Sequence, residues 1–410
     1  MKRPAIILHW VIAGLLVICL VTPPPICLGE ETTTLEPLFS VHLKHEFPES
    51  KKTFEEVKNL ILKNYYSNDI TEEALYWAAI HGMLRHISPP KTPELGQIWT
   101  AEEYDKIYLS RQGQQVSLGF KSTFTPETGI LTVTDVLSNS PAAPILLPFD
   151  RILRIDDQAL KGKTLQEINE LIEGKEDSEV SLTVNRDINI FKITLKRKKF
   201  ATETLIVSRL TDSIALVEIK EFTADISKHL KAELNRLKAG GIQKLIIDLR
   251  NNSGGVFIES LRIVELFLPP KHILLRTYQR DTRIQNYVSE NAEPFTFDVA
   301  VLVNRKTASS AEILASALQD HKKALIIGTR SFGKGVFEKT FKLDNDFRVK
   351  FITGAMYSPK GFSWQDKGIT PDFLVQQDDK TLAALLKMEA KERFHKDVAM
   401  ITAYKLLLRP

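Results

Sequence analysis

The sequence predicts a multidomain α/β protein in which a helical N-terminal segment and a small β-rich module precede an α/β core. Three patterns predict this organisation. Apolar residues recur every three or four positions over residues 53–111, as they do on one face of a helix. Short runs of β-branched residues follow over residues 113–199, and strands then alternate with helices from residue 201 onward. The length of 410 residues suggests two to four domains.

The first segment, residues 1–29, is predicted to be a signal peptide. Lys2 and Arg3 precede an apolar run over residues 5–21, and Gly29 offers a small residue at an exit site. The alternative is an uncleaved membrane anchor, because the run is about as long as the shortest spanning helices. We therefore expect an exported protein of the periplasm or cell envelope, either secreted or associated with the membrane through this segment.

Composition and charge narrow the classes of partner. Hydrophobic residues make up 43% and charged residues 26% of the chain, which is an ordinary globular balance. A net charge of +4 is too weak to indicate a nucleic-acid partner. The two cysteines, Cys19 and Cys27, both lie in the first segment, so its removal would leave no disulfide, thiol chemistry or Cys-ligated zinc.

The next region, residues 30–112, is predicted to be helical after a loosely ordered lead-in. Pro89 and Pro90 interrupt it, and Thr100 with Glu103 has the spacing of a helix cap. We expect this region to be architectural or to support a homo-oligomer.

The β-rich module, residues 113–200, has the pattern of a small binding domain. Strands are predicted at 130–133, 180–184 and 190–195, with one helix over 165–172.

The α/β core, residues 201–375, is predicted to contain a mostly parallel sheet, and residues 376–410 return to a helical pattern. Strands are expected at 214–219, 245–247, 299–303 and 325–327, and helices at 227–238, 256–268 and 311–318.

Ser309 stands between a predicted buried strand and a predicted helix. Its hydroxyl would lie at the carboxyl edge of the sheet and at a helix N-terminus, where free N–H groups favour developing negative charge. This position suits the nucleophile of an acyl transfer. The alternative is that Ser309 or Ser310 only caps the helix.

Lys334 follows the next buried strand and is flanked by Gly333 and Gly335. Without neighbouring Cβ atoms the backbone can pack closely and enclose the amine, which then loses hydration and becomes available as a neutral general base. A phosphate-binding loop is the alternative. The pattern lacks the first glycine of such a loop, and Gly335 stands where Ser or Thr is expected.

A third segment ends in Gly254 and Gly255, between the strand over 245–247 and the next helix. Free N–H groups in such a turn can donate to an oxyanion. A tight strand–helix turn also requires glycine, so the motif alone is weak.

Together these three segments resemble the carboxyl-terminal processing peptidases, the tail-specific proteases of the S41 serine peptidase class. That family shows a D-L-R-x-N-x-G-G turn, an N-x-x-[ST]-A-S-A-[SA]-E-[IV] segment and a T-F-G-K-G segment. The corresponding residues here are Asp248 to Gly255, Asn304 to Ile313 and Ser331 to Gly335. The resemblance covers about residues 55–375 and implies a ClpP/crotonase-like α/β serine protease core.

The resemblance also implies roles for particular residues. Ser309 would be the nucleophile and Lys334 the general base, while the N–H groups of Gly255 and Ser310 would line an oxyanion hole. No metal or cofactor is implied. The family usually has glutamine four residues after the lysine, where this chain has Glu338. A carboxylate there would stabilise the ammonium and oppose its role as base, which makes Glu338 the least secure member of the catalytic set.

The module over residues 113–200 resembles a PDZ domain. This resemblance implies capture of the unstructured C-terminal tails of protein substrates by strand addition, with the terminal carboxylate held by backbone amides. Two glycines of the pattern are replaced by Phe149 and Asp157, which questions the turn geometry. A domain that only braces the core is the alternative. The residues that match the carboxylate-binding loop are Ser117, Leu118, Gly119 and Phe120.

We therefore expect an exported serine endopeptidase that cleaves near the C-terminus of protein substrates by a Ser–Lys dyad. A Ser-His-Asp hydrolase using His321 and Asp320 is a rival, although no G-x-S-x-G elbow surrounds Ser309 and His321 is expected to be solvated. A catalytically inactive, exported PDZ scaffold is the alternative from another functional class.

Overall fold

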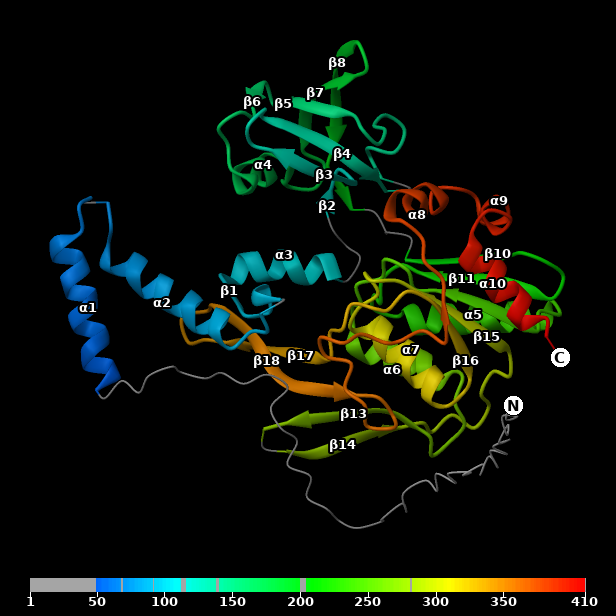
Figure 1. The fold of residues 1–410 in the computed structure, drawn as a ribbon. Coiled ribbons are helices and arrows are strands. Elements are labelled where there is room, and N and C mark those ends of the chain that lie inside the picture. The colour runs from blue at the N-terminus through cyan, green and yellow to red at the C-terminus, as the bar shows by residue number, and fades with distance from the viewer. Residues whose placement is uncertain are drawn as a thin grey trace, which may run out of the picture. The chain divides into compact units, whose positions relative to one another are not determined.

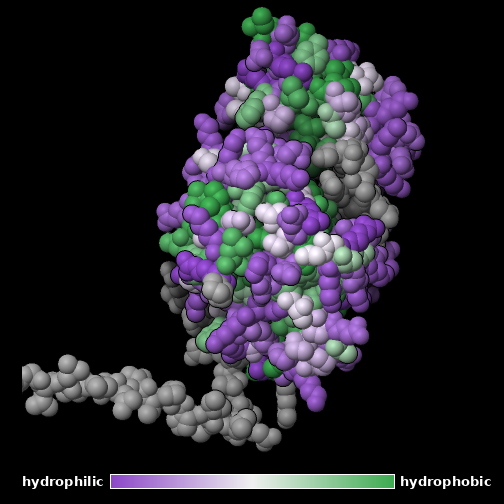
Figure 2. Space-filling model, turned by 90° about the vertical axis from the view of Figure 1, so that its right-hand side faces the viewer, coloured by the Kyte–Doolittle hydropathy of each residue, from purple (hydrophilic) through white to green (hydrophobic). Residues whose placement is uncertain are grey.

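A computed structural model describes residues 49–67, 69–90, 92–111, 116–137, 140–199, 204–280 and 282–409. The predicted signal or anchor segment lies outside these residues. Among the described residues, no helix combines the length and apolar character that crossing a membrane requires. Hydrophilic side chains cover much of the face drawn in Figure 2, with apolar side chains between them.

The N-terminal region is helical, as predicted, and its first long pair of helices ends before the two prolines. Thr100 caps the following helix. Its hydroxyl accepts from the Glu103 N–H at 3.2 Å, and the Glu103 carboxylate accepts from the Thr100 N–H at 2.8 Å. A short strand in this region was not predicted. The elements are α1 (Ser50–Asn64), α2 (Glu72–His86), a 3₁₀ turn (Pro93–Leu95), β1 (Gln97–Trp99) and α3 (Ala101–Arg111).

The β-rich module contains an antiparallel sheet in the order β3-β4-β5-β7-β8, with one helix, so its first long strand lies at an edge. The predicted helix over 165–172 and all three predicted strands are confirmed. The elements are β2 (Val116–Ser117), β3 (Phe120–Thr125), β4 (Ile130–Val136), β5 (Arg151–Ile155), β6 (Gln158–Ala159), α4 (Leu165–Ile172), β7 (Glu179–Arg186), β8 (Asn189–Lys196) and β9 (Lys198–Lys199).

The core is a six-stranded sheet in the order β10-β11-β12-β15-β16-β19, parallel except for β10. Successive residues of a strand point to opposite faces, so Leu245 and Ile247 pack with one set of helices and Ile246 with another. The strands are β10 (Leu205–Arg209), β11 (Ile214–Ile219), β12 (Lys244–Asp248), β15 (Asp298–Val303), β16 (Ala324–Gly328) and β19 (Phe373–Leu374).

Helices cover both faces of this sheet (Figure 1), which explains why its central strands are mostly apolar. Helices α5, α6 and α7 contribute to the larger apolar cluster, and α9 and α10 to the smaller one. The helix predicted over 256–268 is shorter in the structure, where it spans Phe257–Glu265. The helices are α5 (Ile226–Ala239), α6 (Phe257–Glu265), α7 (Ser310–Asp320), α8 (Asp379–Leu385), α9 (Ala390–Phe394) and α10 (Val398–Leu407).

A second, antiparallel sheet was missed by the sequence analysis. Most residues of its strands are half-buried or exposed, so it lacks the apolar runs that marked the first sheet. Its strands are β1, β13 (Ile273–Gln279), β14 (Thr282–Val288), β17 (Val336–Lys342) and β18 (Arg348–Tyr357).

Candidate active site

Ser309 lies in the turn between β15 and α7, as predicted, in a backbone conformation that is rare for a residue with a side chain. Its φ and ψ are 55° and −119°. Such a conformation costs on the order of 1–3 kcal/mol and persists only where the surroundings enforce it. Thr307 helps to enforce it: its hydroxyl donates to the Leu249 carbonyl at 2.8 Å and accepts from the Asn304 N–H at 2.9 Å. Ser309 therefore caps α7 in a strained and half-buried conformation, which a cap alone does not require.

The glycine turn after β12 packs directly against Ser309. A Cβ atom on Gly254, whose φ is 107°, would lie 2.8 Å from the Cβ of Ser309. A Cβ atom on Gly255, whose φ is 138°, would lie 2.3 Å from the Phe222 carbonyl oxygen. The Ser310 hydroxyl donates to the Gly255 carbonyl at 3.1 Å. Both glycines are therefore required, and the turn adjoins the start of α7.

Two backbone N–H groups near Ser309, one in the glycine turn and one at the start of α7, are free among the described residues. Across the described residues, the N–H groups of Gly255 and Ser310 have no hydrogen-bond partner, whereas the Gly254 N–H donates to the Asn252 side chain at 2.8 Å. Unused N–H groups beside a serine are the arrangement that an oxyanion hole needs.

Lys334 lies in a loop that packs closely on residues 364–368, which explains its two glycine neighbours. A Cβ atom on Gly333 would lie 2.8 Å from the Gly368 nitrogen, and one on Gly335 would lie 2.9 Å from the Gln365 nitrogen. The Trp364 indole N–H donates to the Lys334 carbonyl at 2.9 Å. The close backbone packing that was predicted from the glycines is confirmed.

Glu312 joins the serine turn to the lysine loop, and the sequence analysis missed it. One carboxylate oxygen, Oε2, accepts from the N–H of Ser309 at 2.9 Å and from the N–H of Lys334 at 2.8 Å. The two backbone nitrogens are therefore no more than 5.7 Å apart, the sum of these distances. The signal was present, because a glutamate three residues after a capping serine is the spacing of a capping box.

The second oxygen of Glu312, Oε1, is also fully engaged. It accepts from the Ser331 hydroxyl at 2.6 Å and from the Gly333 N–H at 2.7 Å. Burial raises the pKa of this carboxyl, and the four hydrogen bonds offset only part of the shift. Glu312 is thus a buried acceptor that holds two separate loops together.

The amine of Lys334 forms an ion pair within the site. Its Nζ lies 2.8 Å from Oε1 of Glu338, on β17, and the two side chains are 21% and 14% exposed. Glu338 is therefore turned toward the lysine amine.

A buried ionic network supports the glycine turn. The Arg250 guanidinium lies 2.7 Å from an oxygen of Asp248 and 2.7 Å from an oxygen of Asp397, at the start of α10. Burial alone would raise the pKa of Asp248, but the charge and hydrogen bonds of Arg250 hold it below its usual value. The network links the C-terminal helices to the strand that precedes Gly254.

His321 is placed at the other end of α7 from Ser309. An 11-residue helix separates them, which corresponds to roughly 18 Å. His321 is half-buried and its Nε2 contacts the Ile273 carbonyl oxygen at 2.7 Å, so the expectation that it is solvated is wrong. This geometry argues against a Ser309–His321 pair.

The predicted carboxylate-binding loop of the β-rich module precedes the edge strand β3. Leu118 is buried, and Gly119, with a φ of 81°, donates its N–H to the Ser117 hydroxyl at 3.0 Å. Phe149 and Asp157, the two departures from the glycine pattern, have φ values of 76° and 61°. The left-handed turns are therefore kept without glycine.

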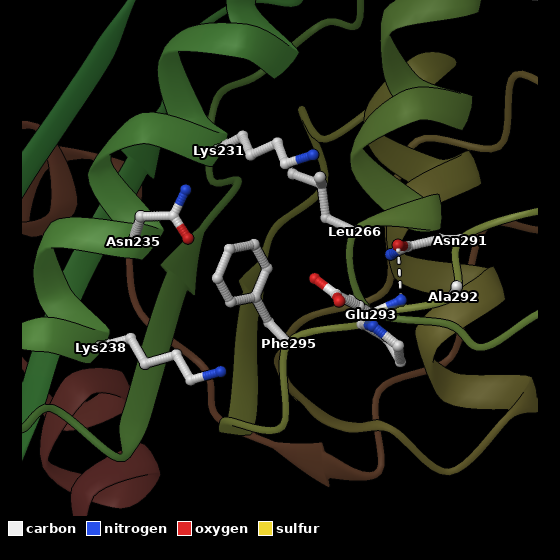
Figure 3. A pocket seen from close by; sticks show the side chains of 9 residues that line it. Lys231, Asn235, Lys238, Leu266, Asn291, Ala292, Glu293 and Phe295 are labelled. Carbon is white, nitrogen blue, oxygen red and sulfur yellow. Dashed lines mark hydrogen bonds between the residues drawn. The ribbon is translucent and has the colours of Figure 1, made fainter.

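A pocket of about 470 Å³ lies away from the residues considered so far (Figure 3). Lys231, Asn235 and Lys238 of α5 face Phe295 and Glu293 across it. No described group of three or more His, Cys, Asp or Glu residues is arranged to hold a metal ion.

Comparison with known proteins identifies both domains. Residues 213–375 match the model of peptidase family S41, and residues 105–196 match that of a PDZ domain. A probable CtpA-like serine protease of Staphylococcus saprophyticus is 27% identical over 331 residues, and one of Staphylococcus aureus is 28% identical over 324. The matches cover 80% and 78% of this chain but only 65% and 64% of the length of those relatives.

Two solved structures share the fold. The photosystem II D1 C-terminal processing protease superposes with a TM-score of 0.52 at 21% identity, over 85% of this chain and 100% of that one. A putative S41 protease of Bacteroides fragilis superposes with a TM-score of 0.58 at 16% identity, over 89% and 99%. Residues 213–375 of this chain therefore form a peptidase family S41 domain, and a PDZ domain precedes it.

Proposed function

We propose that this protein is an exported serine endopeptidase that cleaves near the C-terminus of protein substrates by a Ser309–Lys334 dyad. The observation that supports the proposal most is the Glu312 carboxylate, which hydrogen-bonds the backbone N–H of both residues. Residues that are 25 positions apart in the sequence are thereby held side by side.

The chemistry follows from these positions. Lys334, as a neutral amine, accepts the proton of the Ser309 hydroxyl while Oγ attacks the scissile carbonyl carbon. The N–H groups of Gly255 and Ser310 donate to the oxyanion, and the C–N bond then breaks as the Lys334 ammonium returns a proton to the leaving amine. Water hydrolyses the acyl-enzyme, releasing a carboxylate and restoring the serine.

The PDZ domain supplies tail recognition in this proposal. Strand β3 is at the edge of its sheet, so an extended peptide can pair with it. Phe120 and Phe124 of β3 pack against the domain core, as do Leu171 and Ile172 of α4. A free carboxylate at the end of the peptide would be held at the loop formed by Ser117, Leu118, Gly119 and Phe120.

One observation favours a second function, peptide binding without cleavage. The Lys334 Nζ lies 2.8 Å from a Glu338 carboxylate oxygen, and an amine held in this ion pair is not free to contact the serine hydroxyl. The two functions differ in their response to substitution.

Cleavage of a peptide with an unstructured tail should separate them. We expect Ser309→Ala and Lys334→Ala to lower kcat by about 10³-fold or more, with tail binding unchanged. Lys396→Ala, at an exposed lysine that pairs with Glu392 at the same four-residue spacing, is the matched control. Cleavage that survives in both active-site variants, or that is absent from the parent protein, would reject the dyad.

A further inference from the structure

A second pocket, of about 600 Å³, lies at the carboxyl edge of the core sheet and differs from the proposed peptidase site. It is lined by the residues that directly follow β12, β15, β16 and β19, and by residues of α8 and α10. Crevices beyond the carboxyl ends of parallel strands are where α/β sheets commonly bind ligands, and this volume is in the range of small-molecule sites.

Three of these four strands are followed by an arginine that lines the pocket. Arg250 follows β12, Arg305 follows β15 and Arg330 follows β16. The pocket lining also contains Asp378 and Asp379, and Arg250 is paired with the buried Asp248 and Asp397. Arg305 pairs with Asp379, whereas exposed Arg330 has no ion pair with any described residue.

Arg250 contributes a hydrogen-bond donor that has no acceptor among the described residues. Its side chain is 3% exposed, and its Nε and Nη2 donate to Asp248 and Asp397. The remaining nitrogen, Nη1, is buried and has no hydrogen-bond partner in the described part of the chain. A buried guanidinium N–H without an acceptor is costly, so an acceptor supplied by a ligand would be favoured.

We propose that this pocket binds a small organic oxyanion, a carboxylate or a phosphate, whose oxygens accept from Arg250 Nη1 and pair with Arg330. Planar guanidinium groups match both oxyanions. The side chains of Asn304, Thr329 and Gln376 line the same pocket and can hydrogen-bond the body of the ligand.

This site does not depend on the proposed peptidase activity. Arg250, Arg305 and Arg330 are outside the Ser309–Lys334 pair, and residues 306–308 separate the β15 end of the pocket from the serine. Loss of catalysis in Ser309→Ala should therefore leave oxyanion binding intact, and failure of one proposal can be told from failure of the other.

Thermal unfolding of the full chain tests the site. A ligand that binds the folded state raises Tm with its concentration. We expect sodium phosphate or sodium succinate to raise Tm above the value in sodium chloride of equal ionic strength, and whichever anion acts identifies the group recognised. The same rise should occur in Ser309→Ala.

Variants localise the effect. Arg330→Gln should weaken the apparent affinity at least tenfold, and Arg250→Lys should weaken it as well if that variant folds. Lys238→Gln, which removes a cation from the other pocket (Figure 3), should change nothing. The proposal is overturned if neither anion exceeds the chloride control, or if Arg330→Gln leaves the rise intact.

Discussion

At the scale of single residues, Glu338 is the position where this chain departs most from the expected catalytic set. Its carboxylate lies 2.8 Å from the Lys334 amine. We expect Glu338→Gln to raise kcat/KM several-fold, because the amine is then released from an ion pair that competes with its contact to the serine hydroxyl.

Measurement of kcat/KM at a fixed pH for the parent protein and the variant checks this expectation. Glu392→Gln serves as the control, since it breaks an exposed Lys–Glu pair with the same four-residue spacing. If Glu338→Gln lowers kcat/KM instead, the carboxylate orients the lysine and does not restrain it.

Substitution of Glu312 should displace both the turn that holds Ser309 and the loop that holds Lys334. Each of its oxygens accepts from two donors, so glutamine would place an N–H₂ group against two donors and leave them unpaired. We expect Glu312→Gln to lower kcat at least tenfold and the free energy of unfolding by about 2 kcal/mol.

A split between kcat and KM distinguishes positioning from general destabilisation. Displacement of the two loops should reduce kcat at a temperature where the variant is still folded by circular dichroism. Unchanged kcat in the folded variant would show that the carboxylate is only a structural brace.

At the scale of elements, α10 is tied to the glycine turn through charge. Asp397 caps α10 by accepting from the Ala399 N–H at 3.0 Å and also binds Arg250. Asp397→Asn keeps an acceptor for the cap but removes one charge of a buried network, so we expect the free energy of unfolding to fall by about 3 kcal/mol in urea titrations. Asp379→Asn, at an exposed pair, should have little effect.

The same network gives the stability a pH dependence. Asp248 has a pKa below its usual value in the folded state, so its contribution is present above the ordinary aspartate range. It is lost as pH falls from that range toward the lowered pKa, because the unfolded chain then takes up the proton first. We expect the free energy of unfolding of Asp397→Asn, measured by urea titration, still to fall in this acidic range, because Asp248 and Arg250 remain paired in that variant.

At the scale of the whole molecule, the two domains predict a dependence on the substrate's end. We expect a peptide with a free C-terminal carboxylate to be cleaved with at least tenfold higher kcat/KM than the same peptide with a C-terminal amide, mostly through KM. The physical reason is that the PDZ loop loses its anionic partner in the amide. Equal values for the two peptides would mean that the PDZ domain does not select tails.

Apolar runs were sufficient to predict β11, β12, β15 and β16, because the middle of each of these strands is apolar and buried. The edge strands β10 and β19 were not predicted. Apolar runs were also insufficient for β17 and β18, whose residues are mostly half-buried and alternate poorly. Ser309, Lys334 and the glycine turn could be singled out from motif residues alone. Glu312 and Asp397 could not be placed in the site, because their roles depend on partners 19 to 22 and 147 residues away.

The Glu312 carboxylate joins the backbone of Ser309 to that of Lys334, so the site can form only after both segments have been synthesised. A nascent chain that has emerged as far as the serine has exposed only one side of the arrangement, and the amides at 331–334 and the loop at 364–368 behind them arrive later. Until then the hydrogen bonds of Thr307 to Leu249 and Asn304 can act on the costly serine conformation, but those of the lysine loop cannot. The order of synthesis therefore implies that the arrangement is complete only once residues up to 368 have been made.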